Sequence, residues 1–386
     1  MNLSKNFFYI TFLLAAPLFI VSCDKDDDHH DNHDHTHVVA PATYEFERNG
    51  ESSVSFSGQT CRLQMATDIY NAMNDQNAFT AAEFETMFSD GTGFDFAYDC
   101  GKNIGSKTSA GQGSAVAVRQ QFIDMFTALQ DVYANWDNIA TVGTAGYITT
   151  SGNSTYQVDA KGLEIDQAFI KGLMGAFVVD QISNNYITAS KLDGGCNDPS
   201  DAACLDGDNY TEMEHYWDEG YGYLYGYNNE HVGGTDNNAN GPAEGKGVLV
   251  NKYLKKLNDG SHPGIANTIY DAFKLGRAAI VAGDYIIRDE QAAIIMENLD
   301  KIIAQKAIDY LSGAASTLAD GGAREDTFHG LSEGYGFVLS LQYTSYFTNL
   351  EVTSMLDQMM EGDGFWDITV DELNTMVSQI QSVSGL

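Results

Sequence analysis

Apolar residues recur every three to four positions along most of this chain, and this spacing constrains the fold more than any other feature. In residues 115–136, for example, Phe122, Phe126 and Leu129 share one face of a helix. The same spacing predicts helices over residues 57–73, 163–186, 211–226, 261–282, 292–311, 328–346 and 370–383. Ser261 and Pro263 are typical of the first turn of the helix at 261–282. The sequence therefore predicts an all-α fold.

Two short stretches instead alternate apolar and polar residues, as β-strands do. One surrounds Asn49-Gly50, a pair typical of a hairpin turn. The other covers residues 147–158. The predicted fold class is therefore all-α with one or two short β-hairpins.

One short sequence word occurs twice. His215-Tyr-Trp-Asp-Glu219-Gly-Tyr-Gly-Tyr matches His329-Gly-Leu-Ser-Glu333-Gly-Tyr-Gly-Phe, with His, Glu, Gly, Tyr and Gly identical in place. Such a repeat predicts two related helical bundles that arose by duplication. We expect the halves to be residues 43–227 and 261–386, joined by a linker loop rich in Asn and Gly at 228–260.

Residues four positions apart lie on one face of a helix, so His215 shares a face with Glu219, and His329 with Glu333. Each pair offers one nitrogen and one oxygen ligand. If the two copies face each other, the four side chains suit Zn²⁺ or iron in a helical bundle. Two other interpretations stay open: each pair is hydrogen-bonded inside the core, or acts as an acid/base catalytic pair.

A second candidate metal site lies in the predicted linker. Asp236, Asn238 and Asn240 have the D-x-N-x-N-G spacing of a calcium loop, with Glu244 at the ninth position. The twelfth position, which usually supplies a bidentate Glu, is Gly247. The segment is therefore either an incomplete calcium loop or an ordinary linker.

The N-terminus has the pattern of an export signal. Residues 1–22 combine Lys5 with an apolar run from Phe7 to Val21, and Cys23 follows in a context that resembles a bacterial lipobox. This resemblance implies a lipid on Cys23 and anchoring in the outer membrane. The acidic tract directly after Cys23 resembles the signal that directs some lipoproteins to the cell surface.

Residues 23–42 form an acidic, histidine-rich tether with too few apolar residues to fold. The tether is either a solvated spacer or a weak binder of transition metals, because imidazole is a good ligand for them. Its histidines are His29, His30, His33, His35 and His37.

The remaining cysteines are even in number, which suits disulfides in an exported chain. Cys196 and Cys204 lie close together in a loop, which predicts a local bridge. The sequence does not decide whether Cys61 pairs with Cys100.

The chain is strongly acidic. Its 386 residues include 54 Asp or Glu and 20 Lys or Arg, for a formal net charge of −34. Binding to a nucleic-acid backbone draws its affinity from cationic side chains, so this balance argues against a nucleic-acid partner.

Several words together resemble a family of Gram-negative envelope lipoproteins of unknown function, which is itself similar to imelysin-like proteins. The words are the lipobox, Ser57-Gly-Gln-Thr60, Lys171-Gly-Leu-Met-Gly175, Asp180-Gln-Ile182 and Glu214-His-Tyr-Trp-Asp-Glu219. The resemblance implies two helical bundles, an envelope location and a role in iron uptake or peptide cleavage. The imelysin word is GxHxxE, whereas here the spacing is HxxxE and Thr327 replaces its Gly.

Our leading interpretation is a non-enzymatic, surface-anchored outer-membrane lipoprotein that binds a metal such as iron and works with envelope partner proteins. One alternative is an imelysin-like metallopeptidase. The other is a glycan-binding surface lipoprotein, which rests on the aromatic residues Tyr216, Trp217, Tyr221, Tyr223, Tyr225 and Tyr227.

Overall fold

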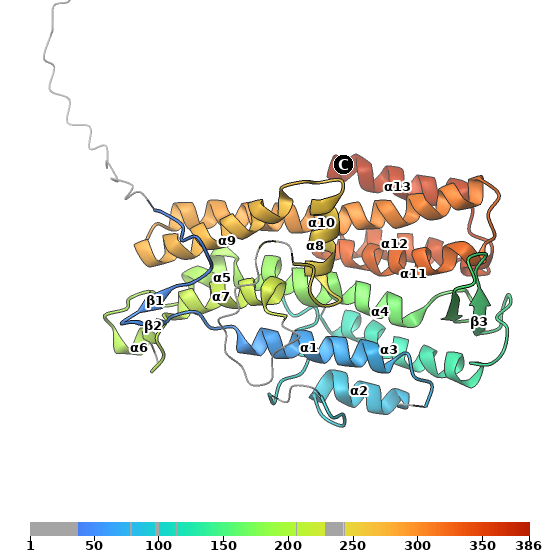
Figure 1. Ribbon diagram of the computed structural model, residues 1–386, viewed down its shortest axis with the longest axis horizontal. Coiled ribbons are helices and arrows are strands. Elements are labelled where there is room, and N and C mark those ends of the chain that lie inside the picture. Colours follow the sequence, from blue (N-terminus) through green and yellow to red (C-terminus); the bar gives the residue numbers. More distant parts are fainter. Residues whose placement is uncertain are drawn as a thin grey trace, which may run out of the picture. The chain divides into compact units, whose positions relative to one another are not determined.

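A computed structural model describes residues 38–77, 79–96, 100–112, 115–205, 207–227, 242 and 244–386. Within these residues the chain forms 13 α-helices and two short antiparallel hairpins, which confirms the predicted fold class (Figure 1). The helices are α1 (Ser57–Ala72), α2 (Ala81–Asp90), α3 (Ala115–Ala134), α4 (Ile165–Leu173), α5 (Ala189–Asp193), α6 (Ala202–Leu205), α7 (Glu212–Tyr225), α8 (Val250–Asp259), α9 (Ile265–Ala282), α10 (Tyr285–Ala319), α11 (Glu325–Ser340), α12 (Asn349–Met359) and α13 (Val370–Ser384).

Both predicted hairpins are present. Strand β1 (Glu47–Arg48) pairs with β2 (Glu51–Ser52), and β3 (Gly146–Thr149) pairs with β4 (Thr155–Val158). The first turn uses Asn49 and Gly50 at φ of 58° and 82°, as a two-residue hairpin turn requires.

The structure differs from the predicted helix ends at α9. This helix begins at Ile265 after Gly264, whose φ is 96°, and not at Ser261 and Pro263. The side chain of Asn258 accepts hydrogen bonds from the backbone N–H groups of Gly264 and Ala266, at 3.1 and 3.3 Å. A residue that precedes the predicted start therefore satisfies free N–H groups at the beginning of this helix.

Helix α8 lies inside the stretch that the sequence predicted as a linker. Its side chains Tyr253, Leu254 and Leu257 are buried, at the spacing of an apolar helix face. Packing of this face against α9 and α10 explains why the segment is helical.

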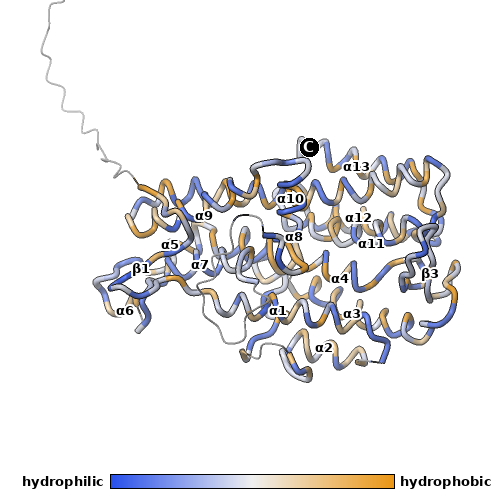
Figure 2. The backbone as a smooth tube through the Cα atoms, viewed as in Figure 1, coloured by the Kyte–Doolittle hydropathy of each residue, from blue (hydrophilic) through white to orange (hydrophobic). Residues whose placement is uncertain are grey.

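Helix α4 is the centre of the fold. It lies between α11 on one side and α1 and α3 on the other (Figure 1). It continues into the π-helical segments η1 (Met174–Val179) and η2 (Ile182–Tyr186). Every residue from 162 to 182 is buried. Helix α13, by contrast, has both exposed and buried residues, and hydrophilic and hydrophobic positions alternate along it (Figure 2). A helix buried on all sides belongs to the core.

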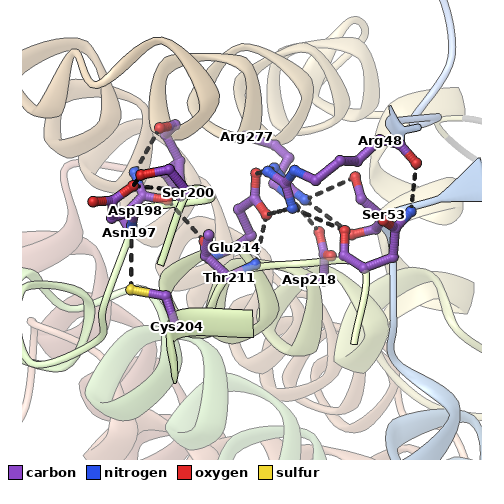
Figure 3. A network of polar contacts seen from close by, with 12 residues as sticks. Arg48, Ser53, Asn197, Asp198, Ser200, Cys204, Thr211, Glu214, Asp218 and Arg277 are labelled. Atoms are coloured by element: carbon purple, nitrogen blue, oxygen red, sulfur yellow. Dashed lines mark hydrogen bonds and ion pairs between the residues drawn. The ribbon is translucent and has the colours of Figure 1, made fainter. Parts of the chain in front are cut away.

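A largely buried ion network fixes the N-terminal segment to the helices (Figure 3). Arg277 on α9 lies 3.0 Å from a carboxylate oxygen of Glu214 and 3.0 Å from one of Asp218, both on α7. Arg48 on β1 donates two hydrogen bonds to Glu214, at 2.8 and 2.9 Å. Two guanidinium groups and two carboxylates thus balance one another, which buried charges require.

Two disulfides crosslink the chain. Cys196 is bonded to Cys204, which confirms the predicted local bridge. Cys61 on α1 is bonded to Cys100, a pairing that the sequence left open.

Several predictions lie outside the described residues. They are the signal peptide at residues 1–22, the lipidated Cys23, the tether histidines His29, His30, His33, His35 and His37, and the calcium-loop residues Asp236, Asn238 and Asn240. Across the part of the chain that is described, no helix is long and apolar enough to cross a membrane.

Candidate functional site

His329 on α11 lies at the start of α4, between two carboxylates. Its Nδ1 atom is 3.1 Å from both carboxylate oxygens of Glu164, the residue that precedes α4. Its Nε2 atom is 3.9 Å from an oxygen of Glu333, one turn along α11. The imidazole ring stacks on Tyr156 of β4, with ring centres 4.5 Å apart. The structure therefore brings the predicted His329 and Glu333 together and adds Glu164.

Ser332 holds the two elements in register. Its hydroxyl accepts a hydrogen bond from the backbone N–H of Glu164 at 2.8 Å and donates one to the carbonyl of Phe328 at 2.7 Å. This satisfies a backbone N–H at the beginning of α4, where no carbonyl of the same helix is available. Ser332 lies about one turn after His329 on α11, so this hydrogen bond holds Glu164 close to the imidazole.

Glu333 is part of a buried ion pair. Lys171 of α4 lies 3.0 Å from its Oε1 atom, and the hydroxyl of Tyr253 donates a 2.9 Å hydrogen bond to the same atom. Burial alone would raise the pKa of Glu333, but the Lys171 ammonium and donated hydrogen bonds lower it to about 2. Glu333 is therefore ionised and already neutralised by protein groups.

Further polar side chains of α4 continue this network into the core. Lys171 donates a 2.7 Å hydrogen bond to Gln167, which in turn donates to the hydroxyl of Tyr70 and to Asp166, both at 2.9 Å. Burial raises the pKa of Asp166. Charged and amide side chains inside an otherwise apolar helix need such partners. That is the signal in the sequence that could have identified Lys171 and its neighbours.

The Glu164–His329 pair has a distinct electrostatic character. Burial raises the pKa of Glu164 to about 7, even though His329 acts in the opposite direction. Burial lowers the pKa of His329, but the hydrogen bond and charge of Glu164 outweigh it, so the pKa is raised above its usual value. Each side chain thus shifts the pKa of the other through the hydrogen bond that they share.

The imidazole is the accessible part of this group. The side chain of His329 is 36% exposed, against 5% for Glu164 and 11% for Glu333. A small ion can therefore reach His329 from solvent, with a buried carboxylate on each side of the ring.

The first copy of the word has different surroundings. His215 stacks on Tyr210 with ring centres 4.7 Å apart, and its buried Nδ1 has no hydrogen-bond partner among the described residues. Glu219 accepts a 2.8 Å hydrogen bond from Gln59 of α1. Within the described chain, no hydrogen bond or ion pair joins His215 to Glu219, or either of them to His329 or Glu333. The structure therefore places the two copies at separate sites.

The copies do share one packing feature. A Cβ atom at Gly222 would lie 3.1 Å from that of Gln59 on α1, and one at Gly336 would lie 2.4 Å from that of Lys171 on α4. In each copy the second glycine packs on an earlier helix, and that same helix supplies the partner of the repeated glutamate. The division into two related halves stays a prediction.

The aromatic residues that follow His215 belong mostly to the core. Trp217, Tyr221, Tyr223 and Tyr225 are all buried. They contact one another, α9, the N-terminal segment and the π-helical segments after α4, so they do not present a row of rings to solvent.

Groups of three or more His, Cys, Asp or Glu side chains placed to hold a metal ion are absent from the described residues. An ion at His329 would thus have the imidazole and Glu164 as its protein ligands and would complete its coordination with water. This set is smaller than the four-residue set that the sequence predicted.

Comparison with known proteins gives a family but no function. The sequence matches a protein-family model described as a domain of unknown function (DUF4856), over residues 41–386. No curated protein and no solved structure matches it. The similarity to imelysin-like proteins stays a prediction.

Proposed function

The chain belongs to this family of unknown function, and we propose that it is a non-enzymatic, lipid-anchored binding protein of the outer-membrane surface. We further propose that it takes up a transition metal ion, such as iron or zinc, at Glu164 and His329. The supporting observation is the 3.1 Å approach of both Glu164 oxygens to an imidazole nitrogen that is accessible from solvent.

The donor set suits such an ion. Two donors bonded to one zinc ion at about 2.0–2.2 Å lie about 3 to 3.5 Å apart, which is the spacing of Glu164 and His329 Nδ1. Imidazole and carboxylate are ligands for zinc and for iron. An ion would replace the proton of the hydrogen bond between Glu164 and His329.

Glu333 has a supporting role in this arrangement. A metal-binding histidine commonly directs its second ring nitrogen at a carboxylate, which fixes the ring. Glu333 faces Nε2 and is itself held by Lys171 and Tyr253. Because Lys171 already neutralises Glu333, we propose that Glu333 orients the imidazole ring and does not bind the ion.

The proposal is tested with the full chain in which the five tether histidines are replaced by Asn, so that the tether cannot bind the ion. Zn²⁺ and Fe²⁺ are equilibrated separately with this protein, and bound metal is measured by elemental analysis after dialysis. We expect about one ion per chain. We expect Glu164→Gln and His329→Asn each to lose most of it, because each removes one of two protein ligands.

His215→Asn is the matched control, since it changes the histidine of the other copy. We expect this variant to bind metal as the parent does. Metal content no higher than a blank, or undiminished binding by both site variants, would show that the proposed site is wrong. Loss of binding in His215→Asn would also contradict the proposed site, because His215 lies apart from Glu164 and His329.

The membrane anchor is tested independently of the metal. Cells that express the full chain or its Cys23→Ala variant are labelled with a radioactive fatty acid and separated into membrane and soluble fractions. We expect label and membrane association only with Cys23 present, and digestion of the parent by protease added to whole cells. An unlabelled parent would contradict the anchor, and a labelled but protected one would contradict surface exposure.

A further inference from the structure

A cavity of about 390 Å³ lies among α3, α11, α12 and the loop before α4. It opens on a different face of α11 from His329 and Glu333, because Tyr335 and Leu339 of that helix line it. Much of the lining is apolar: Met125, Leu163, Ile165, Leu339, Leu356 and Met360. A pocket of this size and lining suits a small organic molecule with an apolar body.

The charged side chains of the cavity are mainly acidic. Asp159 lies within it, and Asp124 and Asp357 are exposed at its edges. Lys161 also lines the cavity, but its ammonium donates a 2.5 Å hydrogen bond to the carbonyl of Met360. Three carboxylates against one ammonium give the cavity a negative potential, which favours a cation.

Asp159 has one carboxylate oxygen available. Its Oδ1 atom accepts hydrogen bonds from the backbone N–H groups of Lys161 and Leu163, at 2.8 and 2.9 Å. Its Oδ2 atom has no hydrogen-bond partner among the described residues. The backbone therefore fixes this carboxylate while Oδ2 stays free to accept a hydrogen bond from a bound molecule.

Tyr335 supplies an aromatic surface. It occupies the same place in the repeated word as Tyr221, on which the ring of Tyr44 stacks with ring centres 3.6 Å apart and an interplanar angle of 5°. No aromatic ring of the described residues contacts Tyr335. The first copy thus shows a flat ring held on this tyrosine, and in the second copy the tyrosine lines a cavity instead.

We propose that this cavity binds a primary amine with a planar apolar body, an arylalkylamine, as a site separate from the metal site. The ring lies against Tyr335 and the apolar lining, and the ammonium group donates to Asp159, with Asp357 adding negative charge at the edge. A charge-assisted hydrogen bond combined with aromatic contact gives both affinity and selection for a cation.

The test uses three ligands of nearly the same shape and different charge, titrated into the full chain by calorimetry. These are phenethylamine, the neutral 2-phenylethanol and the anionic 3-phenylpropionate. We expect saturable binding of phenethylamine, at least about tenfold weaker binding of the alcohol, and none of the acid. We also expect the affinity for the amine to fall as salt is added.

Two variants locate the site. Asp159→Asn keeps Oδ1 for the loop and removes the negative charge, and we expect at least a tenfold loss of affinity for phenethylamine. Asp357→Asn changes an exposed side chain with little bearing on folding, and we expect a smaller loss of about two- to fivefold. Asp371→Asn, an exposed acid on α13, is the control and should bind as the parent does.

The proposal is wrong if phenethylamine does not bind saturably, or if the acid binds as well as the amine. It is also wrong if Asp159→Asn and Asp357→Asn, with unfolding midpoints like that of the parent, bind with unchanged affinity. If Asp159→Asn fails to fold, the result for Asp357→Asn and the comparison of the three ligands decide the matter.

Discussion

Gly336 of α11 lies directly against Lys171 of α4. A Cβ atom at position 336 would fall 2.4 Å from the Cβ of Lys171, and 2.9 Å from backbone atoms of Ala168 and Gly172. The absence of a side chain at Gly336 therefore lets the two helices approach closely. This approach brings the Lys171 ammonium within 3.0 Å of Glu333, so the packing of two helices determines the charge environment beside His329.

The first prediction concerns this contact. We expect Gly336→Ala to lower the free energy of unfolding by about 1–3 kcal/mol, because the added methyl group meets backbone atoms that cannot move aside locally. Gly330→Ala, on the same helix, meets its nearest atom at 4.0 Å and should be neutral or stabilising by up to about 1 kcal/mol. Urea unfolding of both variants is the measurement. Equal effects of the two substitutions would contradict the close contact.

The second prediction concerns the π-helical segment that follows α4. The Ser340 hydroxyl accepts a 2.9 Å hydrogen bond from the N–H of Gly175 and donates a 2.8 Å one to the carbonyl of Lys171. A side chain inserted in this way takes the place of the helix's own hydrogen bonds. We expect Ser340→Ala to cost about 1–3 kcal/mol, because it leaves the buried N–H of Gly175 without a partner.

Hydrogen exchange gives the local measurement for Ser340. The amide of Gly175 should exchange faster in Ser340→Ala than in the parent. Ser378→Ala, an exposed serine whose hydroxyl bonds only within α13, should change stability by less than about 0.5 kcal/mol. Unchanged protection at Gly175 would mean that the hydroxyl does not satisfy this N–H group.

Helices and hairpins were predictable because their signals are local. The apolar spacing around Phe122 and the turn pair at Asn49 each need only a few neighbouring residues. The π-helical segment η1 was not predictable, since the Ser340 hydroxyl that bonds to its Gly175 is remote in sequence. The start of α9 was predicted wrongly because the side chain of Asn258, and not that of Ser261, satisfies the free N–H groups of this helix.

The candidate site was predictable only in part. His329 and Glu333 are four residues apart on one helix, so their spacing places them together. Glu164 lies directly before α4, far from His329 in sequence, and no local pattern connects the two residues. The matching word around His215 suggested that the two copies share one site, but Tyr210 and Gln59 give that copy separate surroundings.

The third prediction compares the two disulfides. Cys61 and Cys100 are 39 residues apart in sequence, and Cys196 and Cys204 are 8 apart. A crosslink that closes a longer loop removes more conformational entropy from the unfolded chain. We expect replacement of both Cys61 and Cys100 by Ala to cost about 1.4 kcal/mol more than the same replacement of Cys196 and Cys204. Urea unfolding of the two double variants checks this, and a larger loss for the local pair would contradict it.

The fourth prediction concerns the pH dependence of the buried ion network (Figure 3). Burial acts to raise the pKa of Glu214, but Arg277 and Arg48 outweigh it and lower the pKa below its usual 4.5. A carboxyl whose pKa is lowered by folding stabilises the folded state above its unfolded pKa. This stabilisation is lost as the pH falls through the folded value, because the proton then neutralises Glu214.

Glu214→Gln should therefore cost about 3–5 kcal/mol at pH 7, because it leaves Arg277 buried with one carboxylate fewer. The difference from the parent should shrink progressively as the pH is lowered below 4.5, since the parent then loses the same charge. Urea unfolding of both proteins between pH 7 and pH 3 measures it, with Glu290→Gln at an exposed position as the control. A difference that stays constant over this range would show that the charge of Glu214 does not stabilise the fold.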